Sequence, residues 1–186
     1  GLLYQGHPNE VAVQAGVFTR HGINRVIRYS FELARRRNGK KKLASITKSN
    51  AQGFSMVLWD RIFDEIKIEY PDIETESLLV DAACMNFIRR PESFDVVVAS
   101  NLFGDILTDI GAIITGSVGL AASGNINPEK TYPSMFEPVH GSAPDITGKG
   151  IANPIATILS AGMMLEHLGE LEAAQSIQDA CMTVLR

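Results

Sequence analysis

Two aspartates, Asp105 and Asp109, stand four residues apart in the apolar stretch FDVVVASNLFGDILTDIGA, residues 94–112. Carboxylates at this spacing share one face of a helix and repel each other by roughly 0.2–0.5 kcal/mol when exposed. Because Cys and His are absent nearby, a hard cation that takes oxygen ligands, Mg²⁺ or Mn²⁺, would offset the repulsion. Alternatively, Asp105 complements the helix N-terminus and Asp109 is solvated. Spacing alone leaves both interpretations open.

Two further charged residues follow segments that read as strands. Lys48 closes KLASITK and Asp81 closes ETESLLVD. Open α/β sheets bind ligands outside the carboxyl ends of their strands, so both residues are expected to face the crevice that Asp105 faces from the first turn of its helix. A lysine there could accept a proton, because desolvation and a neighbouring cation lower the pKa of an amine. Each residue alone is more often a surface charge.

Strands and helices alternate over the first part of the chain. Periodicity of two or of 3.6 residues separates the two kinds of segment. It predicts strands over 11–20, 41–48, 74–82 and 94–100, and helices over 21–37, 51–71, 84–92 and 101–114. The last of these helices should bury Leu102, Phe103, Ile106, Leu107, Ile110 and Ile113. The alternation predicts an α/β fold with a mainly parallel sheet and flanking helices.

The texture changes after Gly116, where Gly, Ser, Asn and Pro dominate. A short strand at MFEP leads into a loop, 137–153, whose small residues and prolines suit nucleotide binding. The loop contains neither GxGxxG nor a P-loop, so an irregular structural connection is an equally good reading. Asn153 is a favourable N-cap for a helix from Pro154, and a last helix is expected from Glu170 to Arg186.

Composition bounds the class of protein. The 186 residues carry a net charge of −4, with 45% hydrophobic and 20% charged residues, as in ordinary globular domains. The basic run over 35–42 reads as a solvated helix end rather than a nucleic-acid patch. Cys84 and Cys181 lack zinc or disulfide spacing, which fits the cytoplasm, and the apolar runs are too short or interrupted for a membrane partner. Since the first residue is Gly1, we expect a partial chain.

Four motifs occur in an order that resembles a known family. They are TKSNA at 47–51, LLVDA at 79–83, SNLFGDILTD at 100–109 and EPVHGSAPDITGKGIANP at 137–154. The chain resembles the metal-dependent β-decarboxylating dehydrogenases, whose members act on isocitrate, 3-isopropylmalate, and tartrate or D-malate. EVAVQAGVFTR and NINPEKTYPSMFEP resemble most the tartrate and D-malate branch. The resemblance implies an isocitrate/isopropylmalate dehydrogenase-like fold, present here as a C-terminal partial chain.

The resemblance implies a metal-assisted reaction on a small hydroxy-dicarboxylate. Asp81, Asp105 and Asp109 would hold Mg²⁺ or Mn²⁺, and Lys48 would accept the proton of the substrate hydroxyl as hydride leaves for the nicotinamide. The site would be shared in a homodimer, with Lys48 and Asp81 reaching into the neighbour's cleft. The resemblance also leaves room for a monovalent cation such as K⁺.

The resemblance also assigns cofactor and pocket residues. Ala51 would shape the pocket around the third carbon of the substrate, and its small side chain suits malate or tartrate. Asp145 favours NAD over NADP, because a carboxylate accepts bonds from ribose hydroxyls and repels a 2′-phosphate. Nucleotide contacts would come from Asn50, His140, Gly141, Ser142, Ala143, Asp145 and Asn153.

Residues 1–115 would form part of the smaller substrate, metal and dimerisation domain, and residues 116–186 the C-terminal part of the nucleotide domain. The family's substrate-binding arginines and catalytic tyrosine are expected upstream of Gly1, so this chain alone should be inactive. Two alternatives stay open: a 3-isopropylmalate dehydrogenase, and a non-catalytic, nucleotide-binding regulatory homologue. Retention of Lys48, Asp81, Asp105 and Asp109 argues against the latter. A purely structural interaction protein is the weakest reading.

Overall fold

The computed structural model describes residues 1–185 and divides them into two compact units. Unit 1 comprises Gly1–Ala83 and Glu92–Gly104. Unit 2 comprises Cys84–Pro91 and the described chain from Asp105 onward. The predicted domain boundary after residue 115 stays a prediction. No helix among the described residues is both long and apolar enough to cross a membrane.

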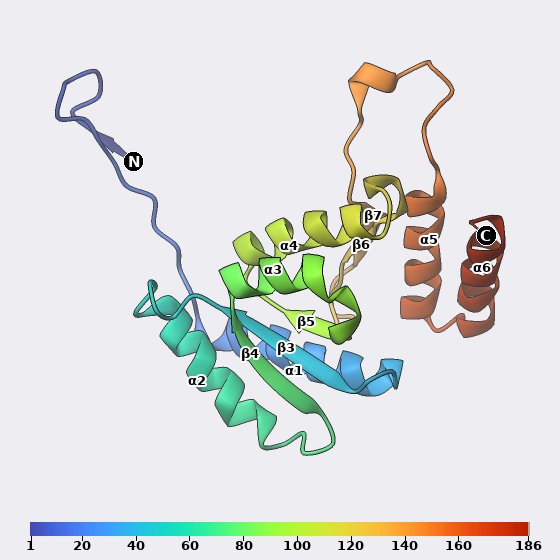
Figure 1. Ribbon diagram of the computed structural model, residues 1–186, viewed down its shortest axis with the longest axis horizontal. Coiled ribbons are helices and arrows are strands. Elements are labelled where there is room, and N and C mark those ends of the chain that lie inside the picture. Colours follow the sequence, from blue (N-terminus) through green and yellow to red (C-terminus); the bar gives the residue numbers. More distant parts are fainter. Residues whose placement is uncertain (186) are drawn as a thin grey trace. The chain divides into compact units, whose positions relative to one another are not determined.

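Unit 1 is built on a parallel sheet of three strands in the order β4-β3-β5 (Figure 1). These are β3 (Lys42–Thr47), β4 (Glu74–Leu79) and β5 (Val96–Val98). The central strand β3 is buried from Leu43 to Thr47, because it has a neighbour on each side. Its alignment with β4 ends at the pair Thr47 and Leu79, so both strands finish at the same level. The predicted parallel α/β arrangement is confirmed.

Two amphipathic helices, α1 (Arg20–Arg37) and α2 (Ser55–Lys67), pack against each other and on this sheet. The side chain of Thr19 caps α1 by accepting a hydrogen bond from Gly22 N at 3.1 Å. Phe31 of α1 is fully buried and stacks on Tyr70 at 4.5 Å between ring centroids. Trp59 Nε1 of α2 donates to Ser45 Oγ of β3 at 2.9 Å, which fixes the helix on the strand.

Several boundaries in unit 1 differ from the predictions. Only β2 (Val11–Ala12) of the predicted strand 11–20 forms, paired with β1 (Leu2–Leu3). Alternation predicts an extended chain, but a strand also needs a hydrogen-bonding partner, and residues 14–18 have none among the described residues. Helix α2 starts at Ser55 rather than at 51, because the preceding residues form a turn on the carbonyl of Lys48.

The helices that follow β4 and β5 also correct the sequence reading. Helix α3 (Val80–Arg89) begins directly after β4, four residues ahead of the predicted Cys84, and is followed by η1 (Pro91–Ser93). Helix α4 (Asn101–Ile114) has the predicted bounds, and Asp105 lies in its second turn rather than in the predicted first turn. The dipole of the first turn therefore does little for the Asp105 carboxylate.

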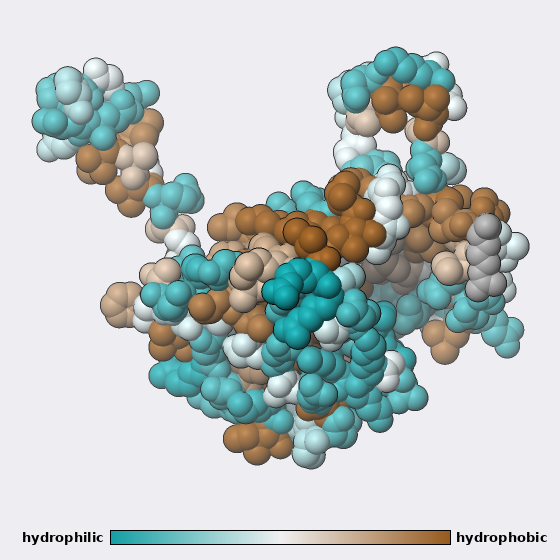
Figure 2. Space-filling view, in the orientation of Figure 1, coloured by the Kyte–Doolittle hydropathy of each residue, from teal (hydrophilic) through white to brown (hydrophobic). Residues whose placement is uncertain are grey.

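The predicted buried face of α4 is only partly buried. Phe103 and Leu107 are 7% and 2% exposed, as expected. Leu102, Ile106 and Ile113 lie open to solvent instead, and apolar side chains gather along α4 in Figure 2. The sequence pattern identified an apolar helix correctly but could not tell a face that packs within the chain from one that does not.

Besides its parts of α3 and α4, unit 2 contains an antiparallel hairpin and two packed helices. The elements are η2 (Val118–Leu120), β6 (Ala122–Asn125), β7 (Met135–Pro138), η3 (Pro144–Ile146), α5 (Ile155–Leu168) and α6 (Leu171–Val184). Strand β6 was not predicted, because ASGN carries almost no strand signal. Gly124 is needed there, since a Cβ atom would lie 2.9 Å from the ring of Phe136. The predicted helical end at Arg186 lies outside the described residues.

The basic run at the end of α1 is largely engaged within unit 1. Arg35 pairs with Asp72 at 2.5 Å and Arg37 with Asp95 at 3.2 Å. Lys42 contacts Glu76 at 2.9 Å, and Lys40 donates to the backbone carbonyl of Glu92. These positive charges were predicted to be solvated, but they form ion pairs and a hydrogen bond within unit 1.

Candidate active site

Lys48 and Asp81 meet where β3 and β4 end. Lys48 follows the last residue of β3, and Asp81 lies in the first turn of α3, two residues beyond β4 rather than in the strand. Lys48 Nζ lies 3.1 Å from Asp81 Oδ1, with the two side chains 26% and 61% exposed. The hydrogen bond from Lys48 lowers the pKa of the Asp81 carboxyl. The predicted convergence of these two strand ends is thus observed within unit 1.

The loop after Lys48 is ordered by its own hydrogen bonds. The N–H groups of Ala51 and Gln52 both donate to the carbonyl oxygen of Lys48, at 2.9 and 2.8 Å. Ser49 N donates to Thr47 Oγ1 at 3.2 Å. Asn50 and Ala51, the predicted cofactor and pocket residues, are exposed at the tip of this turn. The turn therefore leaves the side chains of Asn50 and Ala51 accessible from outside the chain.

Asp105 and Asp109 lie one turn apart on α4, and both are exposed. Neither carboxylate receives a hydrogen bond or an ion pair from residues 1–185. Across that same range, no three Cys, His, Asp or Glu side chains come together as a metal-binding group. The pair supplies two hard oxygen donors with room for further ligands, a donor set that suits Mg²⁺ or Mn²⁺.

The predicted nucleotide loop runs from β7 to α5 in unit 2 and is drawn as a long excursion in Figure 1. Ala143 adopts a left-handed conformation, φ 42°, directly before η3. Gly148 and Gly150 have φ of 76° and 65°, which glycine adopts without a steric penalty. The other predicted residues at 141, 142 and 145 are exposed, and His140 is half-buried with Nδ1 3.0 Å from Gly141 O.

Asn153 at the end of this loop caps α5. Its Oδ1 accepts a hydrogen bond from Ile155 N at 3.0 Å, while Pro154 occupies the geometric cap position. Gly119 of η2 approaches it closely, since a Cβ atom on Gly119 would lie 3.1 Å from Asn153 Cβ. The side chain of Asn153 caps the helix as predicted, but α5 begins at Ile155, one residue after the expected Pro154.

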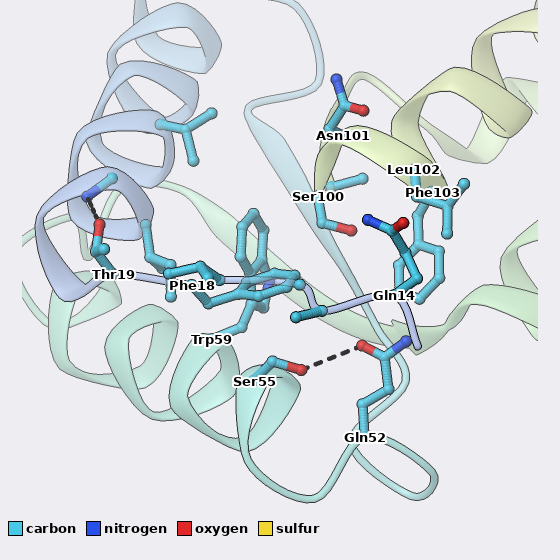
Figure 3. Close-up of a pocket in the computed structure, with 17 residues that line it drawn as sticks. Gln14, Phe18, Thr19, Gln52, Ser55, Trp59, Ser100, Asn101, Leu102 and Phe103 are labelled. Atoms are coloured by element: carbon cyan, nitrogen blue, oxygen red, sulfur yellow. Dashed lines mark hydrogen bonds between the residues drawn. The ribbon is translucent and has the colours of Figure 1, made fainter. Parts of the chain in front are cut away.

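Unit 1 also contains a cavity of about 970 Å³ at the carboxyl ends of β3 and β5 (Figure 3). Its polar lining includes three carboxamides and three hydroxyls, from Gln14, Gln52, Asn101, Thr19, Ser55 and Ser100. Phe18, Trp59 and Phe103 add aromatic surface, and none of the lining side chains among the described residues is ionisable. Ser55 Oγ donates to Gln52 Oε1 at 3.2 Å along one wall. Sequence reasoning missed this cavity, because amides and hydroxyls on separate segments leave no motif.

Known proteins resemble this chain over most of its length. The family model described as isocitrate/isopropylmalate dehydrogenase matches residues 3–186. The chain belongs to this dehydrogenase family. An isocitrate dehydrogenase from Methylococcus capsulatus, known from its crystal structure, superposes with a TM-score of 0.84 at 48% identity, over 89% of this chain and 48% of that one.

Similar members of the isocitrate/isopropylmalate dehydrogenase family carry different substrate names. A 3-isopropylmalate dehydrogenase of Thermobifida fusca is 54% identical over 97% of this chain and 51% of its own length. A decarboxylating D-malate dehydrogenase of Escherichia coli is 54% identical over 91% of this chain and 46% of its own. A probable tartrate dehydrogenase/decarboxylase of Agrobacterium vitis is 50% identical over 97% and 50%. The chain thus spans about half the length of the curated relatives it matches.

Proposed function

We propose that the full-length protein containing this chain oxidises a D-malate- or tartrate-type 2-hydroxy acid with NAD⁺ and decarboxylates the product with the help of a divalent metal. The observation that carries the proposal is the contact between Lys48 and Asp81 at two neighbouring strand ends. It places an amine and a carboxylate at the edge of a parallel sheet where substrates bind. Relatives named for D-malate and tartrate support the substrate class.

Lys48 is proposed as the proton acceptor. With NAD⁺ bound, Lys48 Nζ would take the proton of the C2 hydroxyl as the substrate is oxidised. Asp81 holds the amine in place at 3.1 Å, which fixes the direction in which the nitrogen can accept a proton. Asn50 and Ala51, in the turn that starts at Lys48, would contact the nicotinamide and the third carbon of the substrate.

Asp105 and Asp109, with Asp81, are proposed to hold Mg²⁺ or Mn²⁺. The fit rests on two exposed carboxylates, one helical turn apart, without a positive partner among residues 1–185. A bound divalent cation supplies a Lewis acid that orients the hydroxy acid and stabilises the charge that develops during loss of CO₂. The aspartates contribute negative charge and position, and they leave coordination sites open for the substrate.

A homodimer with shared sites is proposed, in which Lys48 and Asp81 serve the partner's cleft. The exposed apolar side chains of α4, among them Leu102, Ile106 and Ile113, offer a surface for a second copy.

The loop after β7 is proposed to bind the adenosine half of NAD. Its exposed backbone includes left-handed positions at Ala143, Gly148 and Gly150 that turn N–H groups outward. The exposed Asp145 carboxylate suits the ribose hydroxyls of NAD and would repel the 2′-phosphate of NADP. We place the enzyme in the cytoplasm, where the free thiols of Cys84 and Cys181 would stay reduced.

A second candidate, oxidation of 3-isopropylmalate, is favoured by the relative of that name, which is as similar as the D-malate enzyme. Ala51 argues for the smaller substrates, because its methyl group offers little apolar surface for an isopropyl group to pack against.

The test is formation of NADH by the full-length protein with Mn²⁺, in parallel assays with D-malate, L-tartrate, meso-tartrate, 3-isopropylmalate and isocitrate, with and without EDTA. Turnover of D-malate or a tartrate that EDTA abolishes is expected, with NAD⁺ preferred over NADP⁺. Turnover of 3-isopropylmalate alone would replace the first candidate by the second. Turnover of none of the five acids, with NAD binding intact, would support a non-catalytic homologue.

A further inference from the structure

Trp59 and Ser45 join α2 to the central strand β3 by a buried hydrogen bond. The indole Nε1 donates to Ser45 Oγ at 2.9 Å. Trp59 is 2% exposed and Ser45 is 0% exposed. Because water does not reach this contact, a change that removes either partner leaves a buried polar group without its hydrogen bond. The bond therefore fixes where α2 lies along β3.

The same face of β3 also holds the backbone that follows Lys48. Ser45 stands three residues before Lys48 in the chain. Alternate side chains of a strand share a face, so Thr47 lies on the face that Ser45 turns toward α2. Thr47 Oγ1 accepts a hydrogen bond from Ser49 N at 3.2 Å. The chain is thus held directly after Lys48, on the face where Trp59 meets the strand.

The turn after Lys48 is bonded in its turn to the start of α2. The N–H groups of Ala51 and Gln52 donate to Lys48 O at 2.9 and 2.8 Å. Gln52 O accepts from Met56 N at 3.2 Å. Ser55 Oγ donates to Gln52 Oε1 at 3.2 Å (Figure 3). The first turn of α2 therefore cannot shift without moving the turn that begins at Lys48.

These bonds make a closed circuit, from Ser45 along the chain to Trp59 and back through the indole N–H. We call residues 45–59 the Lys48 frame. Lys48 is the only charged residue in it. Its Nζ lies 3.1 Å from Asp81 Oδ1, on the neighbouring strand end. The buried bond between Trp59 and Ser45 is the contact that closes the Lys48 frame through the core of unit 1.

We propose that Trp59 is a positioning residue for Lys48, and that its bond to Ser45 holds the Lys48 frame in the shape that aims the amine at the substrate hydroxyl. The inference rests on the proposed role of Lys48 as proton acceptor. A proton acceptor works only within hydrogen-bond reach of the proton that it takes. A small displacement of the frame therefore slows oxidation while most of the contacts that bind the substrate remain.

The kinetic test removes the bond from either side in the full-length protein, with Trp59→Phe and with Ser45→Ala. Each variant should lower the single-turnover rate of NADH formation by about tenfold or more, with little change in KM, for an acid that the unsubstituted protein oxidises. Because both changes remove the same bond, the double variant should lose hardly more than either single one. Phe63→Leu is the matched control, since it disturbs the buried contact with Phe31 farther along α2, and it should retain the rate.

Amide hydrogen exchange tests the Lys48 frame without any turnover. In either variant that lacks the bond, the N–H groups of Ala51 and Gln52, which donate to Lys48 O, should exchange about fivefold or more faster than in the unsubstituted protein. In the Phe63→Leu control these two amides should exchange at their ordinary rate. An equal acceleration in the control would mean that the fold as a whole has loosened, and would count against the inference.

Two kinetic results would overturn the inference: an unchanged single-turnover rate in both Trp59→Phe and Ser45→Ala, or an equal loss of rate in Phe63→Leu. Failure of the proposed function looks different, because then the unsubstituted protein oxidises none of the acids and Lys48 has no proton to accept. Turnover by the unsubstituted protein, with unaltered rates in the variants that lack the bond, removes only the role of Trp59.

Discussion

Two pairs of charged residues lie near strand ends, and they are built in opposite ways. Lys48 and Asp81 have opposite charges, touch at 3.1 Å and lie on neighbouring strand ends. Asp105 and Asp109 have like charges, are exposed, and receive no counter-charge from residues 1–185. The first pair is complete within the chain, whereas the second gains only from a cation that the chain does not supply. The oppositely charged pair and the two unpaired carboxylates are the two halves of one proposed site.

The largest effect is expected at Lys48, because it is the proposed proton acceptor. Lys48→Met in the full-length protein should lower kcat by about 10²–10⁴-fold, the usual contribution of a positioned proton acceptor, while Mn²⁺ still binds. Steady-state NADH formation measures the loss. Lys67→Met, which breaks the surface pair of Lys67 and Asp64 on α2, is the matched control and should retain activity. A Lys48→Met enzyme of near-normal kcat would remove the assigned role.

The unpaired carboxylates should govern metal affinity. Asp105→Asn or Asp109→Asn is expected to weaken Mn²⁺ binding by more than about tenfold. Even the loss of a residue that only hydrogen-bonds a metal ligand typically lowers metal affinity by about tenfold or more. Titration followed by electron paramagnetic resonance of free Mn²⁺ measures the affinity. Asp179→Asn on α6, where the carboxylate accepts from Gln175 Nε2, should leave it unchanged. Equal affinities for all three variants would show that α4 does not hold the metal.

The ion pair of Lys48 and Asp81 should make the stability of the protein depend on pH in the acidic range. Because Lys48 lowers the pKa of Asp81 in the folded protein, the contribution of the pair to stability is fully present above the pKa of the unfolded carboxyl. It is lost as the pH falls through the lower, folded pKa. In Lys48→Met the titration midpoint of Asp81, followed by carboxyl NMR, should rise toward the ordinary value. Asp72, whose pKa is lowered by Arg35, should titrate as before. An unmoved Asp81 midpoint would mean that the contact does not persist in solution.

The smallest expected effect is a change in stability of the Asp105→Asn variant, and its sign should depend on whether metal is bound. Without metal, Asp105→Asn should stabilise α4 slightly, by about 0.2–0.5 kcal/mol, because one member of a like-charge pair is neutralised. With saturating Mn²⁺ the same variant should be less stable than the unsubstituted protein, since a ligand is lost. Thermal unfolding with EDTA and with Mn²⁺ measures both. The same sign under both conditions would contradict the proposed role of the pair.

Sequence reasoning succeeded where the pattern is local. The apolar run of β3 and the period of α1 predicted the sheet and its helices, because burial on each side leaves a direct trace in residue type. That Lys48 and Asp81 come together followed from their places at two strand ends, whereas their direct contact depends on the register of β3 and β4, which the sequence does not show.

The failures have one physical cause: the missing information lies in partners distant in sequence. Strand β6 forms because it pairs with β7, and the residues ASGN do not indicate this pairing. The apolar residues of α4 look alike whether they face the core, as Leu107 does, or solvent, as Ile106 does. The cavity beside Gln14 and Asn101 arises from segments with neutral side chains that carry no motif.

The central claim, that the two charged pairs complete one site across a dimer, is tested most directly by mixing two full-length variants, Lys48→Met and Asp105→Asn, at a Mn²⁺ concentration at which each alone has little activity. In a mixed dimer one site joins intact Asp105 from one subunit with intact Lys48 from the other. Random reassortment should therefore restore about a quarter of the unsubstituted activity, because half the dimers are mixed and each has one intact site. Mixed dimers that form and stay inactive would contradict the shared site.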